Sequence, residues 1–418
     1  MTAEHEPPAK VAIMVNHAAQ YFAPAFRAFS ARSGLHERVY YWTVPTNGYF
    51  DVGFGRHVEW KTDLYSHYRW WTPSAKPSKT LTRMVQVYRD LRVYRPHALL
   101  CFGWSSPVAI AGLLYGRLAG LPILVYGDTN GRQPATTLRG RLRAPVLRAL
   151  FTQVAGALST GPANAQFYRN HGLPDGRIHH GTLPIAMGPF RAAGIRHAES
   201  RSETGSGRQL VVGFAGKLVT QKGADELVEA VSMLQRDGSW VLRIIGDGPE
   251  RENLEHQVAQ LSLQHHVEFC GFKNTDELPD CLAKMDIFAM PSRWEPRGLV
   301  AIEAMAAGTV PVVSSATGVW GEDDAVQEGI TGFIYPAGRP DLLAVVLSRL
   351  LKDHQLRTDA SERARARAVE FGPEAFVRHA SSALTREIYH YQSCRTVWPY
   401  RDRGASVDEG AGQTADCL

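Results

Sequence analysis

The sequence predicts an α/β protein built from two doubly wound, parallel-sheet domains. Its 418 residues exceed the length of one average domain, so two are expected. In both halves, short apolar segments alternate with longer helical segments, a pattern typical of a parallel sheet with helices on both faces. Residues 185–209 are rich in Arg, Ser, Gly and Glu without an apolar period, which predicts a linker between the domains.

The composition is ordinary for a globular protein, with 44% apolar and 21% charged residues. A net charge of +5 is compatible with an anionic nucleotide or an anionic membrane face and selects neither, and we expect no nucleic-acid partner. Five scattered cysteines without a C-x-x-C pair indicate no disulfide framework and no zinc site, which fits a reducing cytoplasm. The polar start and the lack of a long apolar run argue against a signal peptide and a spanning helix.

The first half alternates predicted strands and helices. Strands are expected at residues 11–16, 38–44, 98–103, 122–128 and 155–161, and helices at residues 21–34, 81–96, 107–120 and 163–171. Ligands bind at the carboxyl ends of strands in such sheets. His17 and Asp128 lie at strand ends, so both are candidates for contact with an acceptor molecule, although a histidine there often only ends the strand.

Two other stretches of the first half are unusual. Residues 40–71 carry eleven aromatic side chains, which can stack on sugar rings, and Trp42 is the candidate there; a core would account for about half of them. Residues 131–151 interleave arginines with leucines, as in a basic amphipathic helix that lies on an anionic membrane, or as in an ordinary surface helix. Pro145 is expected to kink or interrupt this helix.

The second half repeats the alternation. Strands are expected at residues 210–216, 240–246, 267–271, 286–291, 310–313 and 332–336, and helices at residues 222–236, after 249, after 276, at 299–306, at 340–351 and at 372–391. The tail from residue 401 is polar and glycine-rich, which predicts disorder.

Residues 286–315 form the most informative stretch and predict a strand, a loop, a helix and a strand. Glu295 and Glu303 are eight positions apart, about 80° out of phase on a continuous helix. With Glu295 in the loop before the helix, both carboxylates can point at one ligand across the helix N-terminus. That terminus also attracts an anion through its free N–H groups and partial positive charge.

This stretch resembles glycosyltransferase family 4, whose frame is P-S-x-x-E-x-x-G-L-V-x-x-E-A-M-A-x-G. The matching residues are Pro291, Ser292, Glu295, Gly298, Leu299, Val300, Glu303, Ala304, Met305, Ala306 and Gly308. The resemblance is strong over residues 211–351 and weak in the first half. It implies the GT-B fold, in which two Rossmann-like domains face a cleft. The implied parts are an acceptor-binding domain (1–190), a nucleotide-sugar domain (191–371), a helix crossing back (372–400) and a disordered tail (401–418).

The family's motifs imply roles for individual residues. Glu295 would contact the transferred sugar and Glu303 the ribose. The G-R-L-x-x-x-K-G motif has Lys217 in place of Arg, which keeps the charge but loses the bidentate fork, so Lys217 and Lys222 would grip the diphosphate. The donor-site candidates are Gly216, Lys217, Lys222, Gly246, Gly248, Gly271, Phe272, Glu295, Gly298, Leu299, Val300 and Glu303. The catalytic candidates are Glu295, Lys222 and Asp128, and the acceptor candidates are His17, Trp42 and Asp128.

The chain departs from the family at three further places. The loop at residues 16–21 has no glycine pair, Gly127 replaces the histidine that often precedes the aspartate, and Trp320 interrupts a glycine pair. The adjacent acids at residues 322–324 resemble a metal cluster, but neighbouring carboxylates rarely converge and the family needs no metal. We therefore expect no cofactor and assign no metal ligand.

The sequence therefore predicts a retaining glycosyltransferase of the hexosyltransferase class. Its donor would be a nucleotide-diphosphate sugar, with UDP favoured, and its acceptor a carbohydrate, lipid-linked or small-molecule hydroxyl in surface polysaccharide or glycoconjugate assembly. It would be cytoplasmic or peripheral on the inner face of the plasma membrane. The alternatives are glycosylation of a soluble secondary metabolite, a non-catalytic nucleotide-sugar binder, and an NAD-linked oxidoreductase; Arg251, in place of the third glycine of G-x-G-x-x-G, argues against the last.

Overall fold

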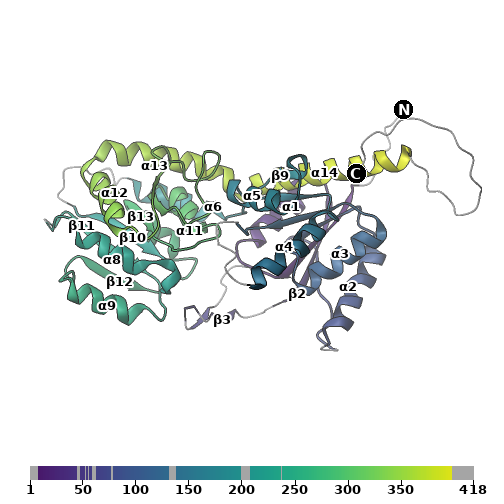
Figure 1. Cartoon of the computed structure of the whole chain (residues 1–418), viewed down its shortest axis with the longest axis horizontal. Coiled ribbons are helices and arrows are strands. Elements are labelled where there is room, and N and C mark those ends of the chain that lie inside the picture. The colour runs from purple at the N-terminus through teal and green to yellow at the C-terminus, as the bar shows by residue number, and fades with distance from the viewer. Residues whose placement is uncertain are drawn as a thin grey trace, which may run out of the picture.

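The computed structural model describes residues 8–44, 48–51, 53–54, 56–58, 63–76, 79–130, 138–198, 208–236 and 238–397. These residues form two lobes side by side, each with a parallel sheet and covering helices (Figure 1). The α/β class with two parallel-sheet domains is therefore confirmed. The predicted tail, residues 401–418, lies outside the described residues.

The first domain contains a seven-stranded sheet in the order β5-β2-β1-β6-β7-β8-β9. Its strands are β1 (Lys10–His17), β2 (His36–Thr43), β5 (Trp70–Trp71), β6 (Ala98–Phe102), β7 (Ile123–Gly127), β8 (Gly156–Ser159) and β9 (Ile178–His180). Its helices are α1 (Ala23–Arg32), α2 (Thr80–Tyr94), α3 (Pro107–Ala119), α4 (Leu138–Phe151), α5 (Pro162–Asn170) and the 3₁₀ turn η1 (Asp175–Arg177). A separate antiparallel hairpin joins β3 (Tyr49–Asp51) to β4 (Arg56–Val58).

The second domain contains a six-stranded sheet in the order β12-β11-β10-β13-β14-β15. Its strands are β10 (Leu210–Ala215), β11 (Trp240–Ile245), β12 (Val267–Gly271), β13 (Ile287–Met290), β14 (Val310–Ser314) and β15 (Phe333–Tyr335). Its helices are η2 (Thr220–Lys222), α8 (Ala224–Ser232), α9 (Arg251–Gln260), α10 (Leu278–Ala283), α11 (Leu299–Ala306), α12 (Pro340–Lys352), α13 (His354–Ala368) and η3 (Val369–Phe371).

Each sheet has a point where its strand order reverses. In the first sheet β1 pairs with both β2 and β6, and in the second β10 pairs with both β11 and β13. The loops after the two central strands leave toward opposite faces there, which opens a crevice at the carboxyl edge of the sheet. The fold thus offers one candidate ligand site in each domain.

The first part of the linker predicted at residues 185–209 is a helix, and residues 199–207 lie outside the described residues. Residues Met187–Arg196 form helix α6, which buries Met187, Phe190, Ala193 and Gly194. The helix packs on α10 and α11 of the second domain. A Cβ atom on Gly194 would lie 2.7 Å from the backbone oxygen of Ala307, so only glycine allows this approach. The apolar spacing of α6 is too short to stand out among the small and charged residues around it.

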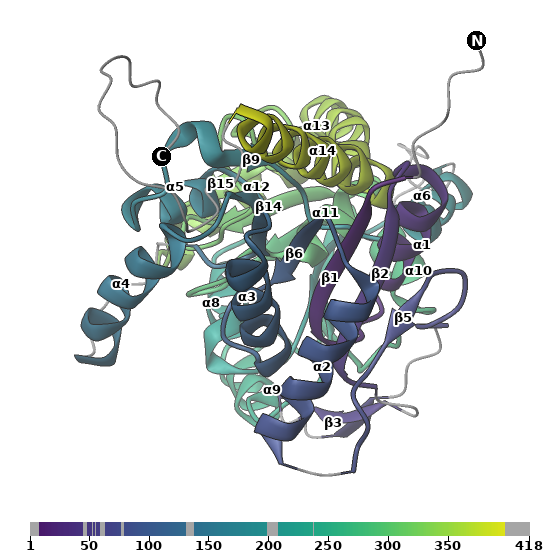
Figure 2. The same ribbon diagram turned by 90° about the vertical axis from the view of Figure 1, so that its right-hand side faces the viewer.

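The last helix, α14 (Pro373–Val397), connects the domains. It follows the second domain in sequence but packs on α1, β6 and β9 of the first domain (Figure 2). Phe376 of α14 is buried against Phe102 and Tyr126 of the first sheet. This aromatic contact belongs to a core cluster that includes residues of both domains. Within the described parts of the chain, no helix has the length and apolarity that crossing a bilayer requires.

Candidate active site

One cavity lies at the carboxyl edge of the second sheet, and we call it the second-domain cavity. It measures about 440 Å³ and is walled by the loops after β10, β11 and β12 and by the first turn of α11. Six of the predicted donor-site residues line it: Gly216, Lys217, Lys222, Gly246, Phe272 and Val300. Three loops that are separate in the sequence therefore place predicted donor-site residues in one cavity.

Lys222 is held at this cavity by an ion pair with Glu295, which follows β13. Both side chains are largely buried, 26% exposed for Lys222 and 14% for Glu295. Gly223, next to the lysine, has a φ of +66°, and a Cβ atom there would lie 2.1 Å from the backbone oxygen of Pro291. Only glycine lets the two loops come this close. Backbone N–H of Arg293 also donates to the Gln221 oxygen at 2.9 Å, which ties the lysine loop to the glutamate loop.

Glycines shape the rest of the second-domain cavity. Gly246 has a φ of +139°, and a Cβ atom on it would meet the Gly216 backbone oxygen at 1.8 Å. Gly271 accepts a hydrogen bond from the Gly246 N–H at 2.9 Å. Gly248, Gly271 and Gly298 all have positive φ but do not line the cavity, so they fix loop geometry.

Glu303 lies on α11, three residues after Val300 and therefore on the same side of the helix. Its side chain makes no hydrogen bond or ion pair with another described residue, and burial raises its pKa to about 7. The left-handed Gly298 precedes the helix, and Gly308, also left-handed with a φ of +79°, follows its end. Glu303 lies one turn into the helix and is not part of the wall of either cavity described here.

A second cavity, which we call the first-domain cavity, lies at the carboxyl edge of the first sheet. It measures about 310 Å³ and is lined by residues that follow β1, β6 and β7, including His17, Trp104 and Asp128. The sequence predicts His17 and Asp128 for one site, and the structure brings them to this wall. Leu299, predicted for the donor site, lines this cavity instead, while its neighbour Val300 lines the other. Both cavities therefore border the first turn of α11.

Asp128, which lines the first-domain cavity, has a raised pKa. Burial raises its pKa, and the negative charge of Glu295 in the other domain raises it further, while the cation of Arg297 opposes the shift. Burial and Asp128 together raise the pKa of Tyr21, which lines the same cavity, to about 12. The carboxylate of Glu295 thus acts on Asp128 across the domain boundary.

Two residues that the sequence analysis missed lie at this boundary. The Asn130 amide donates to the backbone oxygens of Pro296, at 2.7 Å, and Glu295, at 3.3 Å. Arg297 is 3% exposed and pairs with the fully buried Asp324 at 2.6 Å. This pair also shows that Asp324 is not available to a metal cluster. Arg297 stands inside the recognised frame at a variable position, which is why the pattern did not reveal it.

Trp42, which the sequence predicts as an acceptor residue, does not line the first-domain cavity. Its ring packs with the core on the face of the sheet that α2 and α3 cover, and the guanidinium of Arg83 lies 4.2 Å from the ring centroid. Alternation along β2 explains the outcome, because Tyr41 faces the opposite side.

Most of the described aromatic side chains between residues 40 and 71 are likewise structural. Tyr40, Tyr41 and Tyr68 are buried in the core, and Trp70 packs on Tyr65. The exception is Phe54, which lines the second-domain cavity rather than an acceptor site. Trp60 lies outside the described residues.

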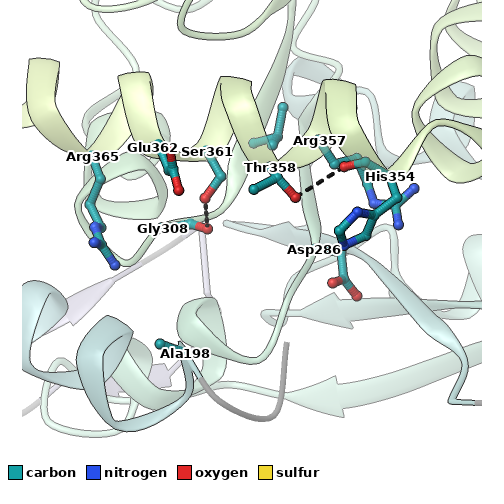
Figure 3. A pocket seen from close by; sticks show the side chains of 10 residues that line it. Ala198, Asp286, Gly308, His354, Arg357, Thr358, Ser361, Glu362 and Arg365 are labelled. Atoms are coloured by element: carbon teal, nitrogen blue, oxygen red, sulfur yellow. Dashed lines mark hydrogen bonds between the residues drawn. The ribbon is translucent and has the colours of Figure 1, made fainter. Parts of the chain in front are cut away.

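A third cavity, of about 310 Å³, lies at the opposite edge of the second sheet, beside α13 (Figure 3). Asp286, which precedes β13, faces it and is already paired with Arg208 at 2.6 Å. The Ser361 hydroxyl donates to the Gly308 oxygen at 2.7 Å, and the Thr358 hydroxyl to the His354 oxygen at 3.0 Å (Figure 3). These groups satisfy one another, and the cavity lies away from the carboxyl edge.

Comparison with known proteins decides the class. Residues 196–367 match the family described as Glycosyl transferases group 1, a range that covers both lysines, both glutamates and all of the second-domain cavity except Phe54. The chain is a glycosyltransferase.

Curated relatives agree with this assignment. The glycosyltransferase is 28% identical over 270 residues to an alpha-D-kanosaminyltransferase of Streptomyces kanamyceticus, which covers 62% of this chain and 69% of the relative. It is 32% identical over 273 residues to a GDP-mannose-dependent alpha-(1-6)-phosphatidylinositol monomannoside mannosyltransferase of Mycobacterium tuberculosis, covering 60% of this chain and 66% of the relative. The matches span about two thirds of both relatives.

A solved structure extends the comparison to nearly the whole glycosyltransferase. HepE of Anabaena, solved in complex with UDP, has a TM-score of 0.68 and 18% identity and covers 90% of this chain and 100% of its own. At that identity the likeness concerns the fold, which is GT-B as the sequence predicts.

Proposed function

We propose that the chain is a retaining glycosyltransferase that moves a sugar from a nucleotide-diphosphate donor to an acceptor hydroxyl. The observation that carries this proposal is that one helical turn borders both cavities, with Leu299 lining one and Val300 the other. A donor in the second-domain cavity and an acceptor in the first-domain cavity would then share that turn. Holding both reactants there supplies much of a transfer rate.

In this proposal the second-domain cavity binds the donor. When the glycosidic bond breaks, negative charge develops on the diphosphate, and the ammonium groups of Lys217 and Lys222 offset it. Glu295 already contacts Lys222 and would hold it for the phosphate while contacting the sugar. Glu303, close to Val300, would accept hydrogen bonds from the ribose.

The first-domain cavity would orient the acceptor. Asp128 and His17 line it and can hold an attacking hydroxyl at the first turn of α11. We propose front-face attack, in which the acceptor oxygen bonds to the anomeric carbon, the diphosphate leaves, and a departing phosphate oxygen takes the acceptor proton. This route retains the anomeric configuration and needs neither a covalent intermediate nor a metal.

A lipid-linked or glycan acceptor in surface glycoconjugate assembly is our first choice, and a soluble metabolite is the second. The mycobacterial relative is named for a phosphatidylinositol mannoside, which favours the first, and the kanosaminyl relative leaves the second open. UDP is our first choice of nucleotide because HepE is solved with UDP, whereas the mycobacterial relative is named for GDP-mannose.

A donor screen tests the proposed function. UDP-, GDP-, ADP- and dTDP-sugars are added to the full chain in the presence of EDTA, and thermal unfolding and donor turnover are recorded. We expect one nucleotide class to raise the melting temperature, because a ligand of the native state stabilises it, and to be turned over without metal. Binding without transfer or hydrolysis would favour the non-catalytic alternative, and no response to any donor would contradict the proposal.

We also propose that α4 contacts an anionic membrane at the inner face of the plasma membrane. Its residues Arg143 and Arg148 flank Val146, which is 66% exposed, and Pro145 lies inside the helix without ending it. Residues 131–137 lie outside the described part of the chain. Exposed apolar and basic side chains together are typical of interfacial helices.

Sedimentation with vesicles checks this contact. We expect the chain to bind phosphatidylglycerol-containing vesicles and to lose most of that binding in Arg143→Gln/Arg148→Gln. The matched control is the double variant Arg236→Gln/Arg251→Gln. It removes two arginines of the second domain that are exposed or partly exposed. Equal binding of the two double variants to the vesicles would contradict the proposed membrane contact.

A further inference from the structure

The β3–β4 hairpin of the first domain contacts the second-domain cavity. Asp51, at the end of β3, places its Oδ1 atom 2.8 Å from the Nζ atom of Lys217. The aspartate side chain is 5% exposed and the lysine 37% exposed. Phe54, from the same hairpin, lines the cavity itself. A segment far from the family frame therefore pairs with one of the two lysines expected to bind a diphosphate.

Other contacts hold the hairpin in this position. The Phe54 ring packs edge-on against Phe272, with centroids 4.9 Å apart, and the guanidinium of Arg56 lies 4.7 Å from the Phe272 centroid. A Cβ atom on Gly248 would lie 2.9 Å from the backbone oxygen of Gly53, so the turn rests directly on the glycine loop. The hairpin is thus docked through its backbone, its aromatic ring and its charge.

The turn itself fixes the carboxylate. Asp51 Oδ1 accepts hydrogen bonds from the backbone N–H groups of Gly53, at 2.9 Å, and Phe54, at 3.2 Å. A side chain held by two local bonds needs no further ordering to meet Lys217. Like a phosphate, its carboxylate presents negatively charged oxygen atoms to the lysine.

A diphosphate on Lys217 would be close to this carboxylate. Two anions that approach the same ammonium group repel each other and compete for it. A donor must therefore separate Asp51 from Lys217 or bind more weakly beside it.

We propose that Asp51 occupies the diphosphate's place on Lys217 in the free protein, and that donor binding exchanges the carboxylate for the diphosphate. The inference rests on the proposed function, because that function assigns Lys217 to the diphosphate. It makes the first domain a participant in donor binding: the exchange releases one of the contacts that hold the hairpin on the second domain. Asp51 then sets the apparent donor affinity without touching the sugar or the base.

Titration with inorganic pyrophosphate and with UDP tests the exchange on the full chain. Asp51→Asn keeps the acceptor oxygen of the turn and removes the charge. Because Lys217 is more than a third exposed, the pair is partly screened, and we expect both dissociation constants to fall by roughly 2- to 5-fold. Asp63→Asn, a change of an exposed aspartate in the same domain, is the matched control and should leave both constants unchanged.

The double variant Asp51→Asn/Lys217→Gln separates competition from other effects. Without the ammonium group there is nothing to compete for, so removing the aspartate charge should change pyrophosphate binding no further than Lys217→Gln alone does. An unchanged or weaker affinity in Asp51→Asn would overturn the proposal, since it would mean that Asp51 holds Lys217 ready for the ligand.

Hydrogen exchange gives a readout in the unmodified protein. Pyrophosphate should increase amide exchange in peptides covering residues 49–58, because the ligand removes one anchor of the hairpin. Slower exchange there would contradict the exchange of partners. Failure of this inference differs from failure of the proposed function. If a nucleotide sugar is turned over and Asp51→Asn has no effect on binding, only the inference is contradicted. If no nucleotide sugar is turned over, the proposed function is contradicted and the pyrophosphate titration still tests the inference.

Discussion

Replacing Lys222 by alanine is expected to lower kcat/KM for the donor by roughly 100- to 1000-fold, the usual loss when one preorganised group that stabilises developing charge is removed. Lys222 is largely buried, contacts Glu295 and lines the second-domain cavity. Its ammonium group therefore acts with little screening by solvent. The measurement is donor turnover at saturating acceptor, with kcat and KM determined separately.

Lys284→Ala is the control for this loss. Lys284 is an exposed lysine of the second domain that lies outside both cavities, and its replacement should leave turnover within about twofold of wild type. Lys222→Arg keeps the charge and should recover part of the lost rate. Wild-type turnover in Lys222→Ala, with an unchanged melting temperature, would show that the lysine has no part in the reaction.

Replacing Glu303 by glutamine is expected to weaken donor binding and to stabilise the protein at the same time. A carboxylate accepts stronger hydrogen bonds from ribose hydroxyls than an amide does, so the donor KM should rise roughly 10-fold. Burial raises the pKa of Glu303 from near 4.5 to about 7, so ionising it costs the folded state free energy. Glutamine, which does not ionise, avoids this cost.

The stability gain has a definite pH dependence. The folded-state pKa lies above the unfolded value, so the wild-type protein loses stability as pH rises from about 4.5 to about 7 and is constant above that range. The free energy of unfolding of Glu303→Gln should exceed that of wild type by up to about 3 kcal/mol at pH 8 and by little at pH 4.5. Thermal unfolding at the two pH values checks this, with the exposed Glu252→Gln as control. A gain of equal size at both pH values would show that the carboxyl is not titrating as described.

The second-domain site could be predicted from the sequence because its residues lie in short motifs at fixed spacing. Gly223 and Gly298 stand where a left-handed backbone and a close approach exclude other residues. The glycines of these motifs therefore predict the local backbone geometry. The strand and helix that follow Glu295 are apolar enough to be recognised locally. The first-domain site was partly predictable, since His17 and Asp128 both lie at strand ends of a parallel sheet.

Other parts could not be predicted because they depend on long-range packing or on weak apolar patterns. Helix α13 buries only Ala360, Ala364 and Ala368, and most of its other residues are polar, so its apolar stripe has almost no signal in hydropathy. The contact of Asp51 with Lys217 joins residues 166 positions apart, and no local sequence pattern predicts it. The position of Trp42 could not be predicted because the sequence does not say which face of β2 packs against α2 and α3.

A structure of the chain with a bound nucleoside diphosphate tests the central claim most directly. The account predicts that the diphosphate lies in the second-domain cavity against Lys222 and Lys217, with Glu303 beside the ribose and Asp51 displaced from its lysine. A nucleotide bound at the amino edge of the second sheet, beside Asp286 and α13, would contradict it.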